Sequence, residues 1–432
     1  MDWKKIYNEK LTTADEAVKL IKSGNRVVTG LGAGESPVLI DAMMKNHKAY
    51  KGVEIVNILS LVKTEYLDPA IDEHLHYNAL FVSAKSRHAV NEGYADYTPS
   101  FFYRMPQMWE KDLLVDVAVI QVSAPDRHGF CSYGISVDYI KHAAEKAPIV
   151  LAHVNKSMPR ALGDAFIHVS HMTCIVEADV PLLAPPPPAP NEAELAIGKH
   201  CASLINDGDC LQLGFGTIPD AVLAFLKDHK DLGIHTEMFS DGVVDLVHAG
   251  VITCARKNLN PGKIIATFLL GSQKLYDFVD DNPMVAMHPV TYTNDPYIAG
   301  QNDNLVTINS CIQVDLLGQV ASETIGMTQF SGVGGQVDFV RASAISKGGR
   351  AILTMPSTTK SDTISKIVPF LDEGAVVTTS RCDVHLIVTE YGIADLRNKT
   401  CKDRARTLIR IAHPKFRGEL TAAFKQRFNC EF

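Results

Sequence analysis

A short sequence pattern occurs twice in this chain, and it restricts the fold more than any other feature. Residues 21–37 and residues 205–219 each contain a glycine, a short apolar stretch, a Gly-x-Gly pair and a proline. The glycines that agree at one constant offset are Gly24 with Gly208, Gly30 with Gly214, and Gly32 with Gly216. The pattern indicates two halves of the chain that are related by duplication.

Each copy predicts the same local structure. Thr13 and Glu16 have the spacing of a capping box before the first copy, and Asn191 and Glu194 have it before the second. An apolar strand follows in each copy, at 27–29 and at 211–213, and then come a glycine turn and a helix with a proline in its first turn. Helix, strand, glycine turn and helix, repeated twice, predict two related α/β domains.

A proline-rich segment separates the two copies. Residues 184–190 contain only proline and alanine, which predicts an extended connector. A length of 432 residues also suits two domains. We therefore expect an N-terminal α/β domain at residues 1–183, a linker at 184–190 and a C-terminal α/β domain at 191–432. Apolar runs of strand length support this α/β fold at 113–122, 149–154, 264–270, 351–355 and 384–388.

Composition argues against several classes of protein. The chain has 42 Lys and Arg residues against 49 Asp and Glu, and a formal charge of −7 offers no general attraction to nucleic acid or anionic membrane. No stretch approaches the roughly 20 apolar residues of a membrane span, and the first residues do not resemble a secretory signal. The nine cysteines include no Cys-x-x-Cys pair, so we expect reduced thiols, no zinc site and a cytoplasmic protein.

The fingerprints of several common enzyme classes are missing. Gly214-Phe215-Gly216 lacks the third glycine of a dinucleotide-binding motif, which weakens a nicotinamide oxidoreductase. The sequence has no phosphate-binding P-loop, no Gly-x-Ser-x-Gly elbow and no His-Glu-x-x-His motif. The missing elbow and the missing His-Glu-x-x-His motif weaken the hydrolase-triad and zinc-protease interpretations.

Two glycine clusters remain as candidate ligand loops. Residues 214–217 follow an expected strand, where backbone N–H groups and the helix dipole favour anions. Ser331-Gly332-Val-Gly334-Gly335 has three glycines in four residues, which implies close backbone approach or positive φ. Each cluster is equally well explained as a structural turn.

Glu237 lies between the two glycine clusters in the sequence. It follows an expected strand that begins near Ile234, and carboxylates at the carboxyl end of such strands belong where active-site groups collect in α/β proteins. A half-exposed glutamate at a strand edge is the competing interpretation. His235 shares its face by strand alternation and is expected to be structural.

These residues carry a resemblance to a known family. Residues 214–219, 235–242 and 332–339 are similar to signatures of the acetyl-CoA hydrolase/transferase group of family I coenzyme A transferases. Ser123-Ala-Pro-Asp-Arg-His-Gly129 resembles the motif of the first half, and the similarity covers nearly the whole chain. Within the group, the sequence most resembles the enzymes that act on 4-hydroxybutyrate. The next greatest resemblance is to the enzymes that act on butyryl-CoA with acetate.

The resemblance implies a mechanism and its residues. Glu237 would be the nucleophile that forms a mixed anhydride and then a glutamyl-CoA thioester in a ping-pong reaction. Asn294 would lie near it, and Gly334 and Gly335 would donate to the developing oxyanion. The residues implied to bind coenzyme A are Gly214, Phe215, Gly216, Thr217, Ile218, Ser331, Gly335 and Lys360.

The resemblance leaves two rivals open. An acyl-CoA hydrolase of the same fold would let water intercept the glutamyl intermediate, and a non-catalytic acyl-CoA-binding protein would keep the fold without the reaction. The expected substrates are acyl-CoA and short-chain monocarboxylic acids, with no permanently bound cofactor, no metal and no nucleic-acid partner. Family resemblance implies a homodimer or a larger even assembly.

Overall fold

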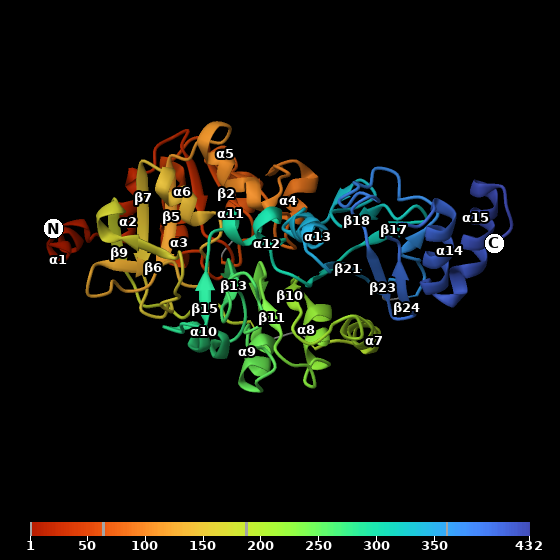
Figure 1. Cartoon of the computed structure of the whole chain (residues 1–432). Helices are drawn as coiled ribbons and strands as arrows, with labels where there is room; N and C mark the ends of the chain where they lie inside the picture. Colours follow the sequence, from red (N-terminus) through yellow and green to blue (C-terminus); the bar gives the residue numbers. More distant parts are fainter. Residues whose placement is uncertain (1, 63–64, 186–188, 360–361) are drawn as a thin grey trace. The chain divides into compact units, whose positions relative to one another are not determined.

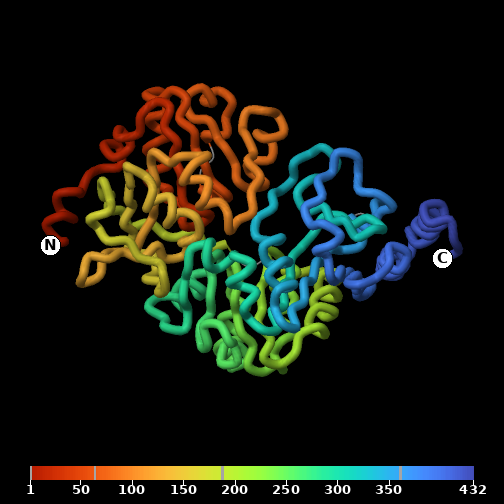
Figure 2. The backbone as a smooth tube through the Cα atoms, turned by 45° about the horizontal axis from the view of Figure 1, so that its top comes forward, coloured from red at the N-terminus to blue at the C-terminus, as the bar shows by residue number. Residues whose placement is uncertain are grey.

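The computed structural model describes residues 2–62, 65–185, 189–359 and 362–432. It divides into two compact units, the first formed by residues 1–186 and 265–293, and the second by residues 187–264 and 294–432 (Figure 1). The chain therefore crosses between the units three times. The segment 265–293 is green to teal in Figure 2. Residues 186–188 of the expected linker lie outside the described residues, and within the described ranges no helix has the length and apolar character needed to cross a bilayer.

The first unit is built on a parallel sheet with seven strands in its described part. The order is β4-β3-β2-β1-β5-β7-β9, so the sequence order reverses between β1 and β5. The strands are β1 (Arg26–Thr29), β2 (Val53–Asn57), β3 (Leu75–Ala79), β4 (Asp96–Tyr97), β5 (Val117–Val122), β7 (Ile149–Val154) and β9 (Cys174–Glu177).

Helices cover this sheet and bury its apolar side chains. Leu39, Ile40 and Met43 of α3 share a hydrophobic core with Val27 of β1 and Ile55 of β2. The helices are α1 (Trp3–Lys10), α2 (Ala14–Ala17), α3 (Pro37–Lys45), α4 (Arg87–Glu92), α5 (Met105–Lys111), α6 (Ile140–Lys146), α10 (Gln273–Val279) and α11 (Val290–Thr293). Short 3-10 turns are η1 (Val18–Leu20), η2 (His47–Ala49), η3 (Glu65–Leu67), η4 (Pro69–Ile71), η5 (Phe102–Arg104) and η6 (Val169–His171).

Residues 265–293 join the first unit through backbone hydrogen bonds. The Val137 N–H donates to the Thr267 carbonyl at 3.0 Å, and the Leu269 N–H donates to the Ile135 carbonyl at 2.8 Å. These bonds explain why an apolar run in the second half of the sequence belongs to the first unit. The short strands here and nearby are β6 (Phe130–Ser132), β8 (Phe166–His168), β13 (Ile264–Ala266), β14 (Phe268–Leu269) and β15 (Val285–Met287).

The second unit contains a sheet of order β11-β10-β16-β21-β23-β24 in its described part. Every neighbouring pair is parallel except β23 with β24. The strands are β10 (Cys210–Leu213), β11 (Gly233–Ile234), β16 (Leu305–Ser310), β21 (Arg350–Thr354), β23 (Leu386–Thr389) and β24 (Gly392–Asp395). The sequence order reverses between β10 and β16, where ligand sites collect in open α/β sheets.

The second unit has its own hydrophobic core. Leu408 and Ile409 of α14 and Phe424 of α15 are buried against Ile387 of β23. The helices are α7 (Glu192–Ala202), α8 (Thr217–Ala224), α9 (Asp241–His248), α12 (Pro296–Ala299), α13 (Gln336–Ile345), α14 (Cys401–Ile411), η7 (Pro414–Phe416) and α15 (Arg417–Phe428). Short strands are β12 (Met238–Phe239), β17 (Gln313–Asp315), β18 (Val320–Ala321), β19 (Thr324–Ile325), β20 (Thr328–Gln329) and β22 (Ile367–Val368).

The predicted α/β fold is confirmed, and its local elements differ in places from the sequence prediction. The capping box of Asn191 and Glu194 is present at the start of α7. Thr13 caps α2, but α2 has only four residues. It continues as the 3-10 turn η1, which ends at Leu20, before the sequence reaches Gly24. The expected strand at 264–270 is divided into β13 and β14, and the strand expected at 113–122 begins only at Val117.

Candidate active site

Glu237 lies at the bend between β11 and β12, at the carboxyl end of the parallel strands of the second unit. β11 forms two ladder pairs with β10, and the His235 N–H then donates to the Leu211 carbonyl at 3.1 Å. After His235 the chain leaves the sheet, and the Glu237 side chain is half-buried. His235 is fully buried, and Nδ1 of its ring lies 3.2 Å from Nδ2 of Asn302, which agrees with a structural histidine.

Asn294 holds the Glu237 carboxylate by a hydrogen bond. Asn294 is fully buried, and its Nδ2 donates to Oε2 of Glu237 at 2.8 Å. The next residue, Asp295, is the N-cap of α12 and accepts from the N–H groups of Tyr297 and Ile298, which fixes this segment. Oδ1 of Asn294 has no hydrogen-bond partner among the described residues. The asparagine thus presents a donor to the carboxylate and keeps a buried acceptor beside it.

Gly335 approaches the same carboxylate with its backbone. A Cβ atom placed on Gly335 would lie 1.9 Å from Oε2 of Glu237 and 2.4 Å from Nδ2 of Asn294. Gly334 has φ +55°, a left-handed conformation that favours glycine. Gly335 is the N-cap of α13, and no side chain among the described residues caps this helix. Uncapped N–H groups at a helix start can serve as donors to an anion, so the turn places potential donors beside Glu237.

The turn at 214–218 is the second glycine loop of this unit. The Gly214 N–H donates to the Ile308 carbonyl at 2.8 Å, Gly216 has φ +131°, and α8 begins at Thr217 without a side-chain cap among the described residues. Phe215 is 68% exposed, and Thr217 Oγ1 donates to Oε1 of Glu194 at 2.5 Å. An exposed aromatic ring and an uncapped helix start can together contact a molecule that has apolar and anionic parts.

The remaining predicted residues have different positions. Ser331 is half-buried; its N–H donates to the Glu323 carbonyl at 2.8 Å, and its own carbonyl accepts from Nε2 of Gln329 at 2.7 Å. Lys360 lies outside the described residues. The structure therefore brings together Glu237, Asn294 and Gly335.

Two side chains that the sequence analysis passed over hold these segments in place. Thr236 is buried beside Glu237, and its Oγ1 accepts from the Leu213 N–H at 3.1 Å. Gln336, which follows Gly335, donates from Nε2 to the Ser310 carbonyl at 2.6 Å and accepts from the hydroxyls of Ser322 and Thr379. Both residues sit directly beside a motif residue, and that adjacency was the available sequence signal.

A buried cation supports the strand that leads to Glu237. Nζ of Lys257 donates to the Ile234 carbonyl and to the Lys263 carbonyl, each at 2.8 Å. Burial lowers the pKa of Lys257 below its ordinary value. Two of the three N–H donors of Lys257 are thus bonded to backbone carbonyls, and the bond to Ile234 anchors the end of β11.

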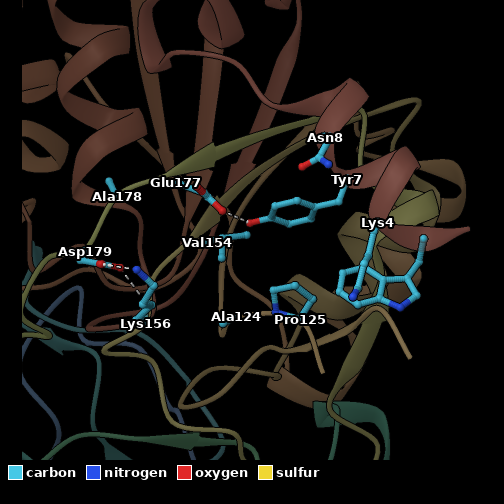
Figure 3. Close-up of a pocket in the computed structure, with 11 residues that line it drawn as sticks. Lys4, Tyr7, Asn8, Ala124, Pro125, Val154, Lys156, Glu177, Ala178 and Asp179 are labelled. Atoms are coloured by element: carbon cyan, nitrogen blue, oxygen red, sulfur yellow. Dashed lines mark hydrogen bonds and ion pairs between the residues drawn. The ribbon is translucent and has the colours of Figure 1, made fainter. Parts of the chain in front are cut away.

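A cavity of about 520 Å³ lies in the first unit, at the carboxyl ends of β7 and β9 (Figure 3). Tyr7 reaches from α1 and donates to Oε1 of Glu177 at 2.6 Å, and Lys156 pairs with Asp179 at 2.9 Å. Burial, followed by the contact with Glu177, raises the pKa of Tyr7. Ala124 and Pro125 of the first-half motif also line the cavity, which the sequence analysis did not predict. No metal-binding group of three or more His, Cys, Asp or Glu residues occurs in the part of the chain that the structure describes.

Family comparisons give the geometry a context. Residues 1–184 match the acetyl-CoA hydrolase/transferase N-terminal domain, and residues 271–424 match the acetyl-CoA hydrolase/transferase C-terminal domain. The chain belongs to the acetyl-CoA hydrolase/transferase family. The expected family is thereby confirmed. The two matches leave 185–270 uncovered, a segment that includes Glu237 and the 214–218 turn.

Individual relatives of this family cover that segment as well. The chain is 57% identical to the 4-hydroxybutyrate coenzyme A transferase of Clostridium kluyveri, over 99% of this chain and 100% of that protein. It is 44% identical to the succinyl-CoA:cyclohexane-1-carboxylate CoA transferase of Geobacter metallireducens, over 98% and 97%. It is 38% identical to the butyryl-CoA:acetate CoA-transferase of Anaerostipes caccae, over 97% of each.

A solved structure agrees with these relatives. The crystal structure of 4-hydroxybutyrate CoA-transferase from Porphyromonas gingivalis superposes with a TM-score of 0.86 at 41% identity, and the match covers 99% of this chain and 100% of that one. The predicted enzyme class, a CoA-transferase, and the predicted fold type are confirmed.

Proposed function

We propose that this family member transfers coenzyme A between short-chain monocarboxylic acids, with Glu237 as a covalent nucleophile. The observation that carries the proposal is the Glu237 carboxylate, which accepts a hydrogen bond from buried Asn294 and lies against the backbone of Gly335 at the start of α13. Acids such as 4-hydroxybutyrate, butyrate and acetate are proposed because the names of similar proteins contain them.

The proposed reaction begins at the thioester carbonyl. A Glu237 oxygen bonds to the acyl carbon, the carbon–sulfur bond breaks, and CoA leaves as a thiolate. The thiolate then attacks the glutamyl carbonyl carbon, the bond to the acyl-bearing oxygen breaks, and the first acid leaves as a carboxylate. A Glu237–CoA thioester remains. An incoming carboxylate reverses both steps. The free energy of the original thioester bond is therefore conserved in the product thioester, and the exchange needs no ATP or metal.

Tetrahedral intermediates in both steps carry negative charge on oxygen. We assign the donors for this oxyanion to the Gly334–Gly335 turn and the side chain of Asn294, because these groups already lie around the carboxylate. Fixed donors aimed at such an oxygen lower the barrier because they need no reorganisation during the reaction.

Coenzyme A is proposed to contact the 214–218 turn, with Ser331 and Lys360 as further contacts. Support comes from the exposed ring of Phe215 and the uncapped start of α8. The homodimeric or larger even assembly and the cytoplasmic location stay predictions. The nine cysteines are free thiols, which suits a reducing compartment.

Trapping the covalent intermediate tests the function. Wild-type enzyme incubated with butyryl-CoA and no acceptor acid should load a thioester that borohydride reduces to an alcohol on the peptide 233–241. E237Q removes the proposed nucleophile. E373Q is the matched control, because Glu373 is an exposed glutamate of the same unit. Transfer should fall about 10⁴-fold or more in E237Q, since loss of a covalent nucleophile has effects of this order, whereas E373Q should match wild type.

The same experiment separates the alternatives. A modification on another glutamate, or transfer without any modification, would refute the role of Glu237. Loss of butyryl-CoA in water at the rate seen with acetate would identify a hydrolase, and no turnover with any acid would indicate a binding protein.

A further inference from the structure

One hydroxyl group connects both sides of the bend that carries Glu237. Oγ1 of Thr236 accepts from the Leu213 N–H at 3.1 Å. It also lies 2.8 Å from the Met238 carbonyl oxygen and 3.1 Å from the Leu213 carbonyl oxygen, and its single proton is donated to one of them. Thr236 is fully buried, so no water competes for these contacts.

The hydroxyl acts as a substitute for the backbone at the end of a strand ladder. In a parallel pair, successive N–H groups on one side of a strand bond to carbonyls of its neighbour. Because β11 ends at Ile234, the Leu213 N–H of β10 bonds to the Thr236 side chain, and the chain can bend away without leaving that buried N–H unpaired.

The same contacts join two parts of the candidate site. Leu213 directly precedes the 214–218 turn, while Met238 directly follows Glu237. A single side chain thus ties the strand before the glycine turn to the backbone on both sides of the carboxylate. Removal of the hydroxyl leaves the Leu213 N–H without its acceptor, and a buried unpaired N–H forces the bend or the turn to shift.

We propose that Thr236 is a positioning residue for Glu237. Its hydroxyl sets where the Glu237 carboxylate lies relative to the 214–218 turn, and so sets the rate at which the carboxylate attacks an acyl-CoA. The inference rests on the proposed role of Glu237 as nucleophile.

Isosteric substitution tests the hydroxyl. T236V keeps the branched shape and removes the hydroxyl, T236S keeps the hydroxyl, and T389V is the matched control. Thr389, at the end of β23 in the same unit, is equally buried, and its Oγ1 donates to the Ile411 carbonyl at 2.6 Å. The measurement is single-turnover loading of wild type and variants with butyryl-CoA. The amplitude of thioester loading reports the fraction of folded enzyme. The rate constant of loading reports the geometry of the nucleophile.

We expect the loading rate constant of T236V to fall about 10- to 100-fold, because misplacement by about 1 Å has effects of this size, while T236S stays within about threefold of wild type. T389V should lose thermal stability to a similar degree and keep its rate constant. A wild-type rate constant in T236V, or an equal loss in T389V, overturns the inference. If T236V does not fold, T236A serves for the same comparison. Failure of wild type to load any thioester would instead refute the proposed function.

Discussion

The close approach of Gly335 to Glu237 makes G335A a severe test of the site. The added Cβ would lie 1.9 Å from Oε2 of Glu237, whereas an ordinary contact between nonbonded carbon and oxygen needs about 3.4 Å. The carboxylate or the glycine must therefore move by about 1.5 Å, the difference between these two distances. Displacement of a reacting group by about 1 Å can lower a rate about 100-fold, so we expect a loss of at least that order, or about 2.7 kcal/mol of transition-state stabilisation.

The assay is kcat/KM for butyryl-CoA with acetate, alongside thermal unfolding. G418A provides the control, because a Cβ on Gly418 would meet no atom within 4 Å and that glycine does not have positive φ. G335A should lose activity per folded molecule. Its unfolding temperature should also fall, because the added Cβ would lie 2.4 Å from Nδ2 of Asn294, which is fully buried and cannot swing aside as the half-buried Glu237 can.

Two results would refute this reasoning. Activity of G335A within about threefold of G418A would show that the Gly335 backbone does not need to approach the nucleophile. A large drop in unfolding temperature with normal activity per folded molecule would show that the turn of Gly334 and Gly335 has only a structural role.

Two further predictions concern the acid and the first unit. An acceptor scan should give higher kcat/KM for acetate, butyrate and 4-hydroxybutyrate than for succinate, because residues 233–242 contain no lysine or arginine to hold a second carboxylate; a clear preference for succinate would exclude the proposed monocarboxylate specificity. Glu35 is buried, and burial raises its pKa to about 8, against hydrogen bonds from Ser60 and Thr29 that favour the ionised form. The folded state therefore retains a proton that the unfolded chain releases near pH 4.5, so the stability of wild type should fall as pH rises from about 4.5 to 8. The unfolding free energy of E35Q, measured by urea denaturation across this range, should lack that part of the decline and exceed wild type at pH 8 by a few kcal/mol; parallel pH profiles would show that Glu35 ionises normally.

Local pattern predicted the elements whose signals lie in adjacent residues. The run at 149–154 is β7 with the same bounds, and the Asn191–Glu194 spacing is a capping box in the structure. The run at 264–270 was predicted as one strand and is two. In this run the Thr267 carbonyl accepts from the Val137 N–H, and the Leu269 N–H donates to the Ile135 carbonyl. These partners lie about 130 residues earlier in the sequence, and a local window contains no information about such pairing.

In the candidate site, too, the local pattern does not predict contacts between residues that are far apart in the sequence. Motif resemblance pointed to Glu237 and also to Asn294 and Gly335, which lie 57 and 98 residues later in the sequence, whereas the local pattern around Glu237 does not connect these positions to it. Sequence spacing does not predict that the Asn294 side-chain amide donates to Glu237 or that a Cβ at Gly335 would collide with the carboxylate. The Thr236 hydroxyl was missed because a β-branched residue near a strand end is ordinary until the ladder is seen to stop at it.

The two copies of the repeated pattern differ in a way that explains why the chemistry is proposed in the second unit. In the first copy two extra residues separate the glycines from the proline, and the longer turn folds back on itself: a Cβ on Gly30 would lie 2.6 Å from the Gly34 carbonyl oxygen, and one on Gly34 would lie 2.2 Å from Cβ of Ser136. Residues 30–36 are all buried. In the second copy α8 starts directly after Gly216, where a Cβ would meet no atom within 4 Å, and Phe215 is exposed. The same strand and glycine turn thus form a closed structural element in one half, whereas in the other they leave an exposed Phe215 and a start of α8 that no side chain among the described residues caps.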